Sequence, residues 1–296
     1  MRVFQRGAAA ATMLLPLLIT GCSLFPTTRK LPVPKTPTIT QTVAPAELVD
    51  RLNKRWAAIS TLTATVEIQA TVIKTKEGSE KDYPTLHGFI LMRKPAMLRV
   101  VGQYLGVRFF NMGSDGKNFT LSIPTLSKVI KGPTKLNKRL PGNPLYNLRP
   151  DFFFDALLVR GLDPDDEYMV EADTDTVEDA ARKHLFLIPE YKLSIMRTKP
   201  GSRERLPLRV VYFRRDNLQP YQQDVYDSEG NLETQVFYDA YKEFDGNTYP
   251  SRITLKRPVE EIQIILTVDQ VKENQPLGDD QFVVAIPENA TVQTLE

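Results

Sequence analysis

Cysteine and histidine are nearly missing from this 296-residue sequence, which holds one cysteine, Cys22, and two histidines, His87 and His184. One cysteine cannot form an internal disulfide, and with so few histidines a metal site would have to use carboxylates. The sequence also has no Gly-x-Ser-x-Gly, no His-Glu-x-x-His and no glycine-rich phosphate loop, the motifs of common hydrolases, zinc peptidases and nucleotide-binding proteins. We therefore expect no catalytic residues, no metal and no cofactor.

Two acid-rich stretches, residues 162–167 and 173–176, are the remaining candidates for a metal site. Both lack the spacing and the glycine of a calcium-binding loop. We interpret them as solvated turns, while a hydrolase that uses a pair of carboxylates stays open.

An excess of charge is also missing once the N-terminal segment is set aside. The chain contains 38 Lys and Arg and 36 Asp and Glu, and two of the arginines, Arg2 and Arg6, lie in residues 1–21. The remainder is balanced at 36 charges of each sign, which gives no support for nucleic-acid binding. Hydrophobic residues make up 42% of the sequence, the usual share for a globular body with a core.

The one long apolar run stands at the N-terminus, where "GAAAATMLLPLLITG" precedes Cys22. It is shorter than the roughly 20 residues of a membrane-spanning helix and contains Pro16, so residues 1–21 are expected to be an export signal. The ending "LITGC" resembles the lipobox of bacterial lipoproteins. That resemblance implies cleavage before Cys22 and a covalent lipid on its thiol. An ordinary secretory signal with a chance cysteine is the alternative.

The residues after the cysteine indicate where the chain would be held. Ser23 stands where an aspartate would retain a lipoprotein in the inner membrane, which favours the outer membrane. Residues 22–45 contain five prolines and no acidic residue, a composition typical of a semi-extended tether. We expect residues 46–296 to form one domain.

That domain is predicted to be mainly β, in the α+β class. Leu48, Leu52, Trp56 and Ile59 follow the spacing of one amphipathic helix after Pro45. From residue 61 the period changes to two, and many short alternating runs are separated by turns such as "SDGKN", "DSEGN" and "FDGNT". This succession of hairpins predicts one large, curved antiparallel sheet.

A second helix is predicted over residues 149–161, "RPDFFFDALLVRG". Asp151 would cap its start and Gly161 would end it. Its apolar residues cover more than one stripe, so it must pack against apolar groups on most sides.

The order of these parts resembles the LolA/LolB lipoprotein-carrier superfamily. Three pieces carry the resemblance: "GFILMRKPAMLRV" (88–100), "RRDNLQPYQQDVYDSEGNLETQVFYDAY" (214–241) and "PLGDDQFVVAIPENATV" (276–292). The resemblance implies a half-open barrel, lined with apolar side chains and covered by helices that act as a lid. By this resemblance Trp56, Phe153, Phe154, Leu157 and Leu158 would belong to the lid or cavity, and plain core packing is the alternative at each position.

The membrane-anchored branch, LolB, is the closer resemblance because it has a lipidated cysteine and a protruding hydrophobic loop. The loop maps onto "GQYLGVRFF", where Leu105 and Gly106 resemble its leucine-glycine tip. Its implied role is to enter the membrane while acyl chains are handed over, whereas an ordinary turn is the alternative. The chain is longer than typical members, and its tip lacks the proline often found there.

Charge is distributed unevenly along the domain. Residues 89–149 contain eleven Lys or Arg and one acid, whereas residues 151–181 contain eleven acids and one base. Basic residues beside an anionic leaflet favour membrane docking. Alternatively, the two blocks face each other in the fold and cancel.

The leading hypothesis is a lipid-anchored lipoprotein on the periplasmic face of the outer membrane. It would bind acyl chains in an apolar cavity and help to receive lipoproteins and insert them, with a soluble periplasmic carrier as a partner. The alternatives are an outer-membrane lipoprotein that binds or senses another lipid or glycolipid, and a structural envelope lipoprotein.

Overall fold

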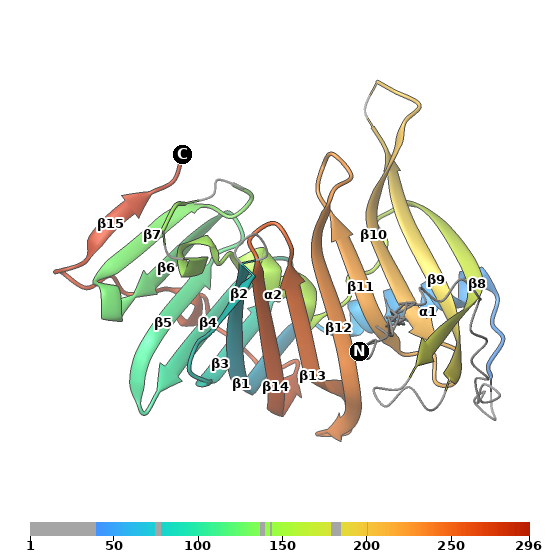
Figure 1. Ribbon diagram of the computed structural model, residues 1–296, viewed down its shortest axis with the longest axis horizontal. Coiled ribbons are helices and arrows are strands. Elements are labelled where there is room, and N and C mark those ends of the chain that lie inside the picture. Colours follow the sequence, from blue (N-terminus) through green and yellow to red (C-terminus); the bar gives the residue numbers. More distant parts are fainter. Residues whose placement is uncertain (1–39, 75–77, 137–139, 143, 179–184, 200) are drawn as a thin grey trace, which may run out of the picture.

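The computed structural model describes residues 40–296 except 75–77, 137–139, 143, 179–184 and 200 (Figure 1). The export signal, Cys22, Ser23 and most of the tether therefore lie outside the described residues, as does His184. In the described part, no helix has both the length and the apolar character needed to cross a membrane.

The described residues form two α-helices, three short 3₁₀ helices and fifteen strands. The helices are α1 (Pro45–Ala58), α2 (Pro150–Leu157), η1 (Pro124–Leu126), η2 (Pro144–Asn147) and η3 (Asp279–Phe282). The strands of the first half are β1 (Thr61–Lys74), β2 (Ser79–Asp82), β3 (Leu86–Arg93), β4 (Met97–Tyr104), β5 (Val107–Ser114), β6 (Asn118–Ile123) and β7 (Lys128–Pro133). Those of the second half are β8 (Glu167–Glu178), β9 (Leu185–Thr198), β10 (Arg205–Arg214), β11 (Pro220–Tyr226), β12 (Leu232–Phe244), β13 (Asn247–Arg257), β14 (Ile262–Glu273) and β15 (Thr291–Thr294).

All fifteen strands belong to one sheet, whose order is β15-β7-β6-β5-β4-β3-β1-β14-β13-β12-β11-β10-β9-β8, with β2 paired to β1. Neighbours are antiparallel except β15, which lies parallel to β7. The strand β1 joins the two halves because it pairs with β3 on one side and β14 on the other. The predicted fold class is confirmed: one large, curved, open sheet is accompanied by two α-helices (Figure 1).

Alternating burial gives the sheet one inner face, which the helices cover. On β1, Ala64, Val66 and Ile68 are buried, while Thr65 and Glu67 between them are only partly buried. Side chains in a strand point alternately to the two faces, so the apolar residues of each strand collect on the face that the helices cover. The core cluster draws on both halves of the sheet and on both helices.

Four of the described strands, β2, β7, β8 and β15, lie where the sequence predicts no strand. The largest is β8, whose residues are mostly exposed, so that its sequence has no apolar alternation to reveal it. The stretch 173–176, predicted as a solvated turn, lies inside β8; that prediction was wrong. The strand β8 is held by its complete pairing with β9 rather than by a buried face.

The predicted first helix is confirmed as α1, which buries Leu48, Val49 and Leu52 against the sheet. Arg55 on its last turn forms a bidentate ion pair with Glu273, the last residue of β14, with one bond of 2.8 Å. The segment before α1 is also fixed, because the backbone N–H of Gln41 donates to the Arg215 carbonyl at 2.7 Å.

Candidate functional site

The helix α2 is shorter than predicted, spanning Pro150–Leu157 instead of 149–161. Its N-cap residue is Arg149, and no side chain caps it, so Asp151 is not the cap but a residue of the first turn. Gly161 does not end the helix. A Cβ at Gly161 would lie 2.8 Å from the Asn53 side chain and 3.1 Å from Trp56, so this glycine permits close approach of α1.

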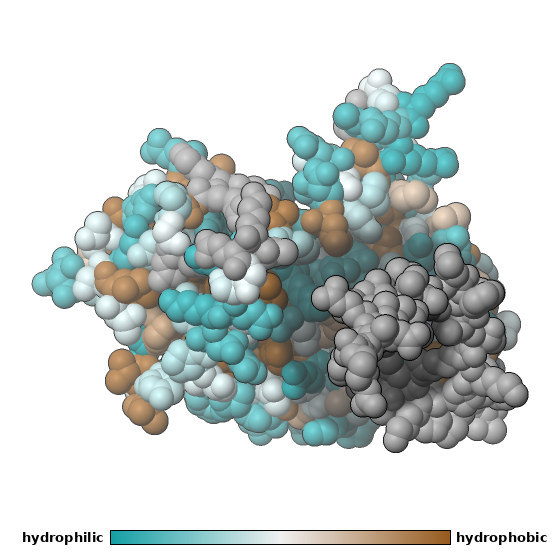
Figure 2. Space-filling view, in the orientation of Figure 1, coloured by the Kyte–Doolittle hydropathy of each residue, from teal (hydrophilic) through white to brown (hydrophobic). Residues whose placement is uncertain are grey.

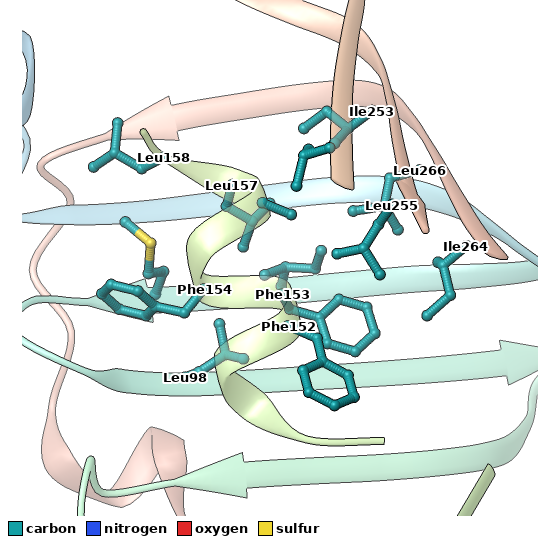
Figure 3. Close-up of a cluster of buried hydrophobic side chains, with 14 of the residues drawn as sticks. Leu98, Phe152, Phe153, Phe154, Leu157, Leu158, Ile253, Leu255, Ile264 and Leu266 are labelled. Carbon is teal, nitrogen blue, oxygen red and sulfur yellow. The ribbon is translucent and has the colours of Figure 1, made fainter. Parts of the chain in front are cut away.

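The apolar residues of α2 fill the middle of the inner face. Phe153 is 1% exposed, and Phe152, Phe154 and Leu157 are also buried. Figure 3 shows them between Leu98 of β4 and side chains of β13 and β14, namely Ile253, Leu255, Ile264 and Leu266. We call this set the α2 cluster.

Trp56 contacts this cluster from α1. Its ring lies 6.5 Å from that of Phe154 in an edge-to-face arrangement, and the Lys94 ammonium lies 4.3 Å from its centroid. Trp56 is only partly buried and packs against the core. These contacts place Trp56 and Phe154 in the packing of the domain, and neither lines one of the two pockets described below.

Charged groups are buried beside the start of α2. Arg257, whose side chain is 2% exposed, pairs with Glu260 at 3.1 Å and with Glu233 at 3.2 Å. Its guanidinium also lies 3.5 Å from the centre of the Phe152 ring. Breaking a buried pair of this kind is costly because it leaves an uncompensated charge.

Two carboxyl groups one turn apart on α2 are strongly affected by this environment. Burial raises the pKa of Asp151 to about 7, and the nearby Asp155 and Glu233 carboxylates add to the increase. Burial likewise raises the pKa of Asp155, against the opposing effect of Arg209 and Arg160. Each carboxyl is therefore easier to protonate in the folded protein than in the unfolded chain.

A pocket of about 340 Å³ lies between α1, the end of α2 and strands β10, β12 and β13. Its wall includes Leu52, Leu157, Leu158, Phe213 and Leu218, all buried apolar residues. Arg51 and Arg55 also line it. We call it the α1 pocket. Leu157 and Leu158, predicted for the cavity or lid, are part of its wall.

Three tyrosines line the α1 pocket, and they differ in how their hydroxyls are bonded. The Tyr249 hydroxyl donates to the Leu157 carbonyl and the Tyr241 hydroxyl to the Pro220 carbonyl, both at 2.6 Å. The Tyr238 hydroxyl is buried and has no hydrogen-bond partner in the described part of the chain. A buried polar group without a partner costs about 1–3 kcal/mol, and burial raises the pKa of Tyr238 well above its usual range.

A second, much narrower pocket of about 20 Å³ lies beside η2 and α2. Phe153 lines it, with Ile68, Phe110 and Ile264 from the sheet. Its walls are almost wholly apolar, but a space of this size is no more than a gap beside the α2 cluster.

The predicted hydrophobic tip is a two-residue turn between β4 and β5. Leu105 is 87% exposed, and the flanking Tyr104 and Val107 are exposed as well. Figure 2 shows hydrophobic surface over this tip. Leu105 has φ 48° and Gly106 has φ 79°, a turn in which Asn and Gly are the preferred residues. A leucine in this strained position has no packing role that would explain it.

The charge blocks lie at different ends of the sheet. Most of the basic block occupies β3 to β7, whereas most of the acidic block occupies the loop before β8 and β8 itself, which is the opposite edge strand. The interpretation that the blocks face each other and cancel is therefore wrong for these strands. Arg108 of the basic block is exposed beside the hairpin tip.

One group on the outer face could hold a metal ion. Glu67 of β1, His87 of β3 and Asp269 of β14 each offer one ligand atom, and these atoms lie within 4.8 Å of one another. His87 and Glu67 already interact, with Nδ1 and Oε1 3.1 Å apart. The prediction that any metal site would use carboxylates alone missed this set because β1 and β3 are paired only in the fold.

Comparisons with known proteins place the fold. No known family profile and no curated protein matches the sequence. Among solved structures, a LolA superfamily protein from Nitrosomonas europaea superposes with a TM-score of 0.50 at 14% identity, over 82% of this chain and 99% of that one. A DUF1329 family protein from Desulfovibrio piger gives 0.50 at 14% identity, over 80% and 95%. The chain therefore has a LolA-like fold.

Proposed function

We propose that this chain is a LolB-like lipoprotein, anchored through Cys22 to the periplasmic face of the outer membrane, that shelters acyl chains and helps to insert lipoproteins. In this proposal the protein binds its ligand without catalysing a reaction. The observation that carries the proposal is the α1 pocket, a space with mostly apolar walls on the covered face of a LolA-like sheet. Acyl chains favour such a space because each CH₂ group removed from water contributes about 0.8 kcal/mol.

The hairpin tip supports the membrane part of the proposal. Leu105 is exposed at the turn between β4 and β5. Arg108 and the other basic residues of β3 to β7 belong to the same half of the sheet. An exposed leucine beside positive charge suits an anionic membrane surface. A soluble periplasmic carrier would deliver the ligand to the pocket.

A second candidate function is the binding of another lipid with one chain. The size of the α1 pocket favours it, since about 340 Å³ is near the lower end of the ~300–1,000 Å³ range for small-molecule sites. A lipoprotein with three acyl chains would require α1 or α2 to move outward. The two candidates therefore differ in whether the pocket is large enough without movement of a helix.

The experiment is a binding titration on the chain from Ser23 onward, which lacks Cys22 and keeps every described residue. A fluorescent triacylated lipopeptide is titrated, and unlabelled lipopeptide or a single-chain lipid is added as competitor. Saturable binding displaced by unlabelled lipopeptide supports lipoprotein transfer. Binding of the single-chain lipid alone favours the second candidate, and no binding by the folded chain rejects both.

The cellular test is the location of lipoproteins after depletion of this protein. Misplaced lipoproteins are expected under the first candidate, and correct sorting under the second. Leu105→Glu should reproduce the sorting defect while the protein itself accumulates normally.

A further inference from the structure

We propose that the α1 pocket selects its ligand by an anionic head group, so that the preferred ligand is a single-chain amphiphile with a carboxylate or a phosphate. This inference rests on the proposed function, because it names the ligand class of the same pocket. The charges, the hydroxyl groups and the size of the pocket support it.

The charged residues that line the pocket are of one sign. Arg51 and Arg55 both line it, and no Asp or Glu of the described residues does. They are four residues apart on α1 and so share one face of the helix. An anion in the pocket would meet two guanidinium groups and no carboxylate in the wall.

The present partners of the two arginines leave Arg51 available to a ligand. Arg51 pairs with Glu47 at 2.9 Å, but the two side chains are 53% and 49% exposed, and such exposed pairs are weak. Arg55 is bound to Glu273, which is 7% exposed, and is held in place. Arg51 is thus the residue that can turn toward an anion, while Arg55 stays paired with Glu273 beside it.

Within the described part of the chain, the Tyr238 hydroxyl is an unsatisfied polar group of a residue that lines the pocket. It is buried and unpartnered among the described residues, whereas the hydroxyls of Tyr241 and Tyr249 are used by backbone carbonyls. Its raised pKa keeps it a neutral donor. A carboxylate or phosphate oxygen that reached this hydroxyl would satisfy it, and a purely apolar chain would not.

The size of the pocket limits the apolar part of the ligand. A volume of about 340 Å³ fits one small molecule or the head-group end of one chain. Leu52, Phe213 and Leu218 form apolar wall around it. Fatty acids and lysophospholipids share this chemistry, and they differ in whether the head is a carboxylate or a phosphate.

The test compares twelve-carbon ligands that differ only in the head. A fluorescent fatty acid bound to the chain from Ser23 onward is displaced with dodecanoate, dodecyl phosphate, dodecanol or dodecyltrimethylammonium. We expect at least one of the two anions to displace the probe at a concentration about tenfold below that of dodecanol, with the cation weakest. The stronger anion shows whether the pocket prefers the carboxylate of a fatty acid or the phosphate of a lysophospholipid.

Arg51→Gln should reduce the advantage of the anion over dodecanol to less than about threefold. The matched control is Arg252→Gln, an exposed arginine of β13 that does not line the pocket, and it should leave all displacement curves unchanged. Tyr238→Phe should lower the affinity for dodecanoate by about three- to tenfold. An unchanged affinity would overturn the proposed contact between the Tyr238 hydroxyl and the ligand.

The failures of the two proposals are distinguishable. If dodecanol displaces the probe as well as both anions do, or if Arg51→Gln behaves as the parent, anion selection is overturned and acyl-chain binding stands. If neither the fluorescent fatty acid nor dodecanol binds the folded chain, the proposed function itself is overturned.

Discussion

The two helices close the inner face of one sheet in different ways. Under α2, the side chains of Phe152, Phe153 and Phe154 are buried against the sheet, and the remaining gap is about 20 Å³. Under α1, the helix leaves about 340 Å³ open. The same sheet is therefore a filled core in one region and a lined pocket in the other.

The difference follows from the residues that each helix directs inward. Six of the eight residues of α2 are buried, so the helix fills most of the space around it. The helix α1 buries only Leu48, Val49 and Leu52, and it directs Arg51 and Arg55 along the pocket instead. Tyrosines of β12 and β13 line the same pocket. Stability should therefore depend most on the α2 region, and binding on the α1 region.

Phe153→Ala should have the largest effect on stability. Phe153 is 1% exposed, and truncating a buried Phe costs about 3–5 kcal/mol of unfolding free energy. Chemical denaturation measures this loss. Phe89→Ala is the control, because Phe89 lies on the outer face of β3 and is 42% exposed. Equal losses in the two variants would contradict the description of α2 as the filled region.

Arg257→Gln should cost about 3 kcal/mol, since removing one partner of a buried ion pair leaves Glu260 uncompensated. The control is Lys54→Gln on α1, where Lys54 and Asp50 are 75% and 54% exposed. That variant should change the unfolding free energy by less than about 0.5 kcal/mol. A small loss in Arg257→Gln would mean that the buried charges contribute little to holding α2.

The pH dependence of stability should also originate under α2. Asp151 has a pKa of about 7 in the folded protein and about 3.9 in an unfolded chain. Because the folded state binds the proton more tightly, this residue favours folding below pH 4, and the contribution is lost as pH rises from about 4 to 7. At about 1.4 kcal/mol per pKa unit, the loss is on the order of 2–4 kcal/mol.

Asp151→Asn removes this titration. The unfolding free energy is measured at pH 5 and at pH 8. Its decrease from pH 5 to pH 8 should be smaller in the variant than in the parent, and the variant should be the more stable protein at pH 8. Identical slopes would show that another carboxyl, such as Asp155, carries the dependence.

The fold could be predicted from the sequence wherever one buried face makes apolar residues recur at a regular spacing. The helix α1 and most hairpins were predicted because apolar residues recur at helical or strand spacing. The strand β8 was missed because it is held by backbone pairing with β9 at an exposed edge. The end of α2 was misplaced because Gly161 is needed for the close packing of α1 and not for ending the helix. That contact joins residues that are distant in sequence.

The candidate site was predicted only in part, for a similar reason. Leu105 and Gly106 stand between two strand patterns, so the hairpin tip could be located from local sequence. The α1 pocket could not, because Arg51, Phe213 and Tyr238 come together only when α1 lies across β10 and β12. Leu157 and Leu158 were expected at a cavity, but as part of an apolar lid rather than beside tyrosines and arginines.

Two substitutions within the α1 pocket should separate a bonded hydroxyl from an unbonded one. Tyr249→Phe leaves the Leu157 carbonyl without its 2.6 Å bond, and we expect a loss of about 1–2 kcal/mol. Tyr238→Phe removes a hydroxyl that has no partner in the described residues, so stability should stay the same or rise slightly. Thermal unfolding without ligand measures both, and equal losses would indicate that Tyr238 is bonded, for example to water.

The smallest effect on stability should come from the tip, where Leu105→Asn changes a residue that touches neither region. Asn tolerates the positive φ of 48° better than Leu, so stability should rise by a few tenths of a kcal/mol. Vesicle binding should move the opposite way, because burying a leucine side chain contributes about 1.5–3 kcal/mol, equivalent to at least a tenfold loss of affinity. The measurement is co-sedimentation of the chain from Ser23 onward with anionic vesicles. Leu126→Asn is the control, since Leu126 of η1 is also exposed, at 46%, but lies between β6 and β7. If both variants bind as the parent does, the tip is an ordinary turn, and the pocket under α1 has to receive its ligand without help from Leu105.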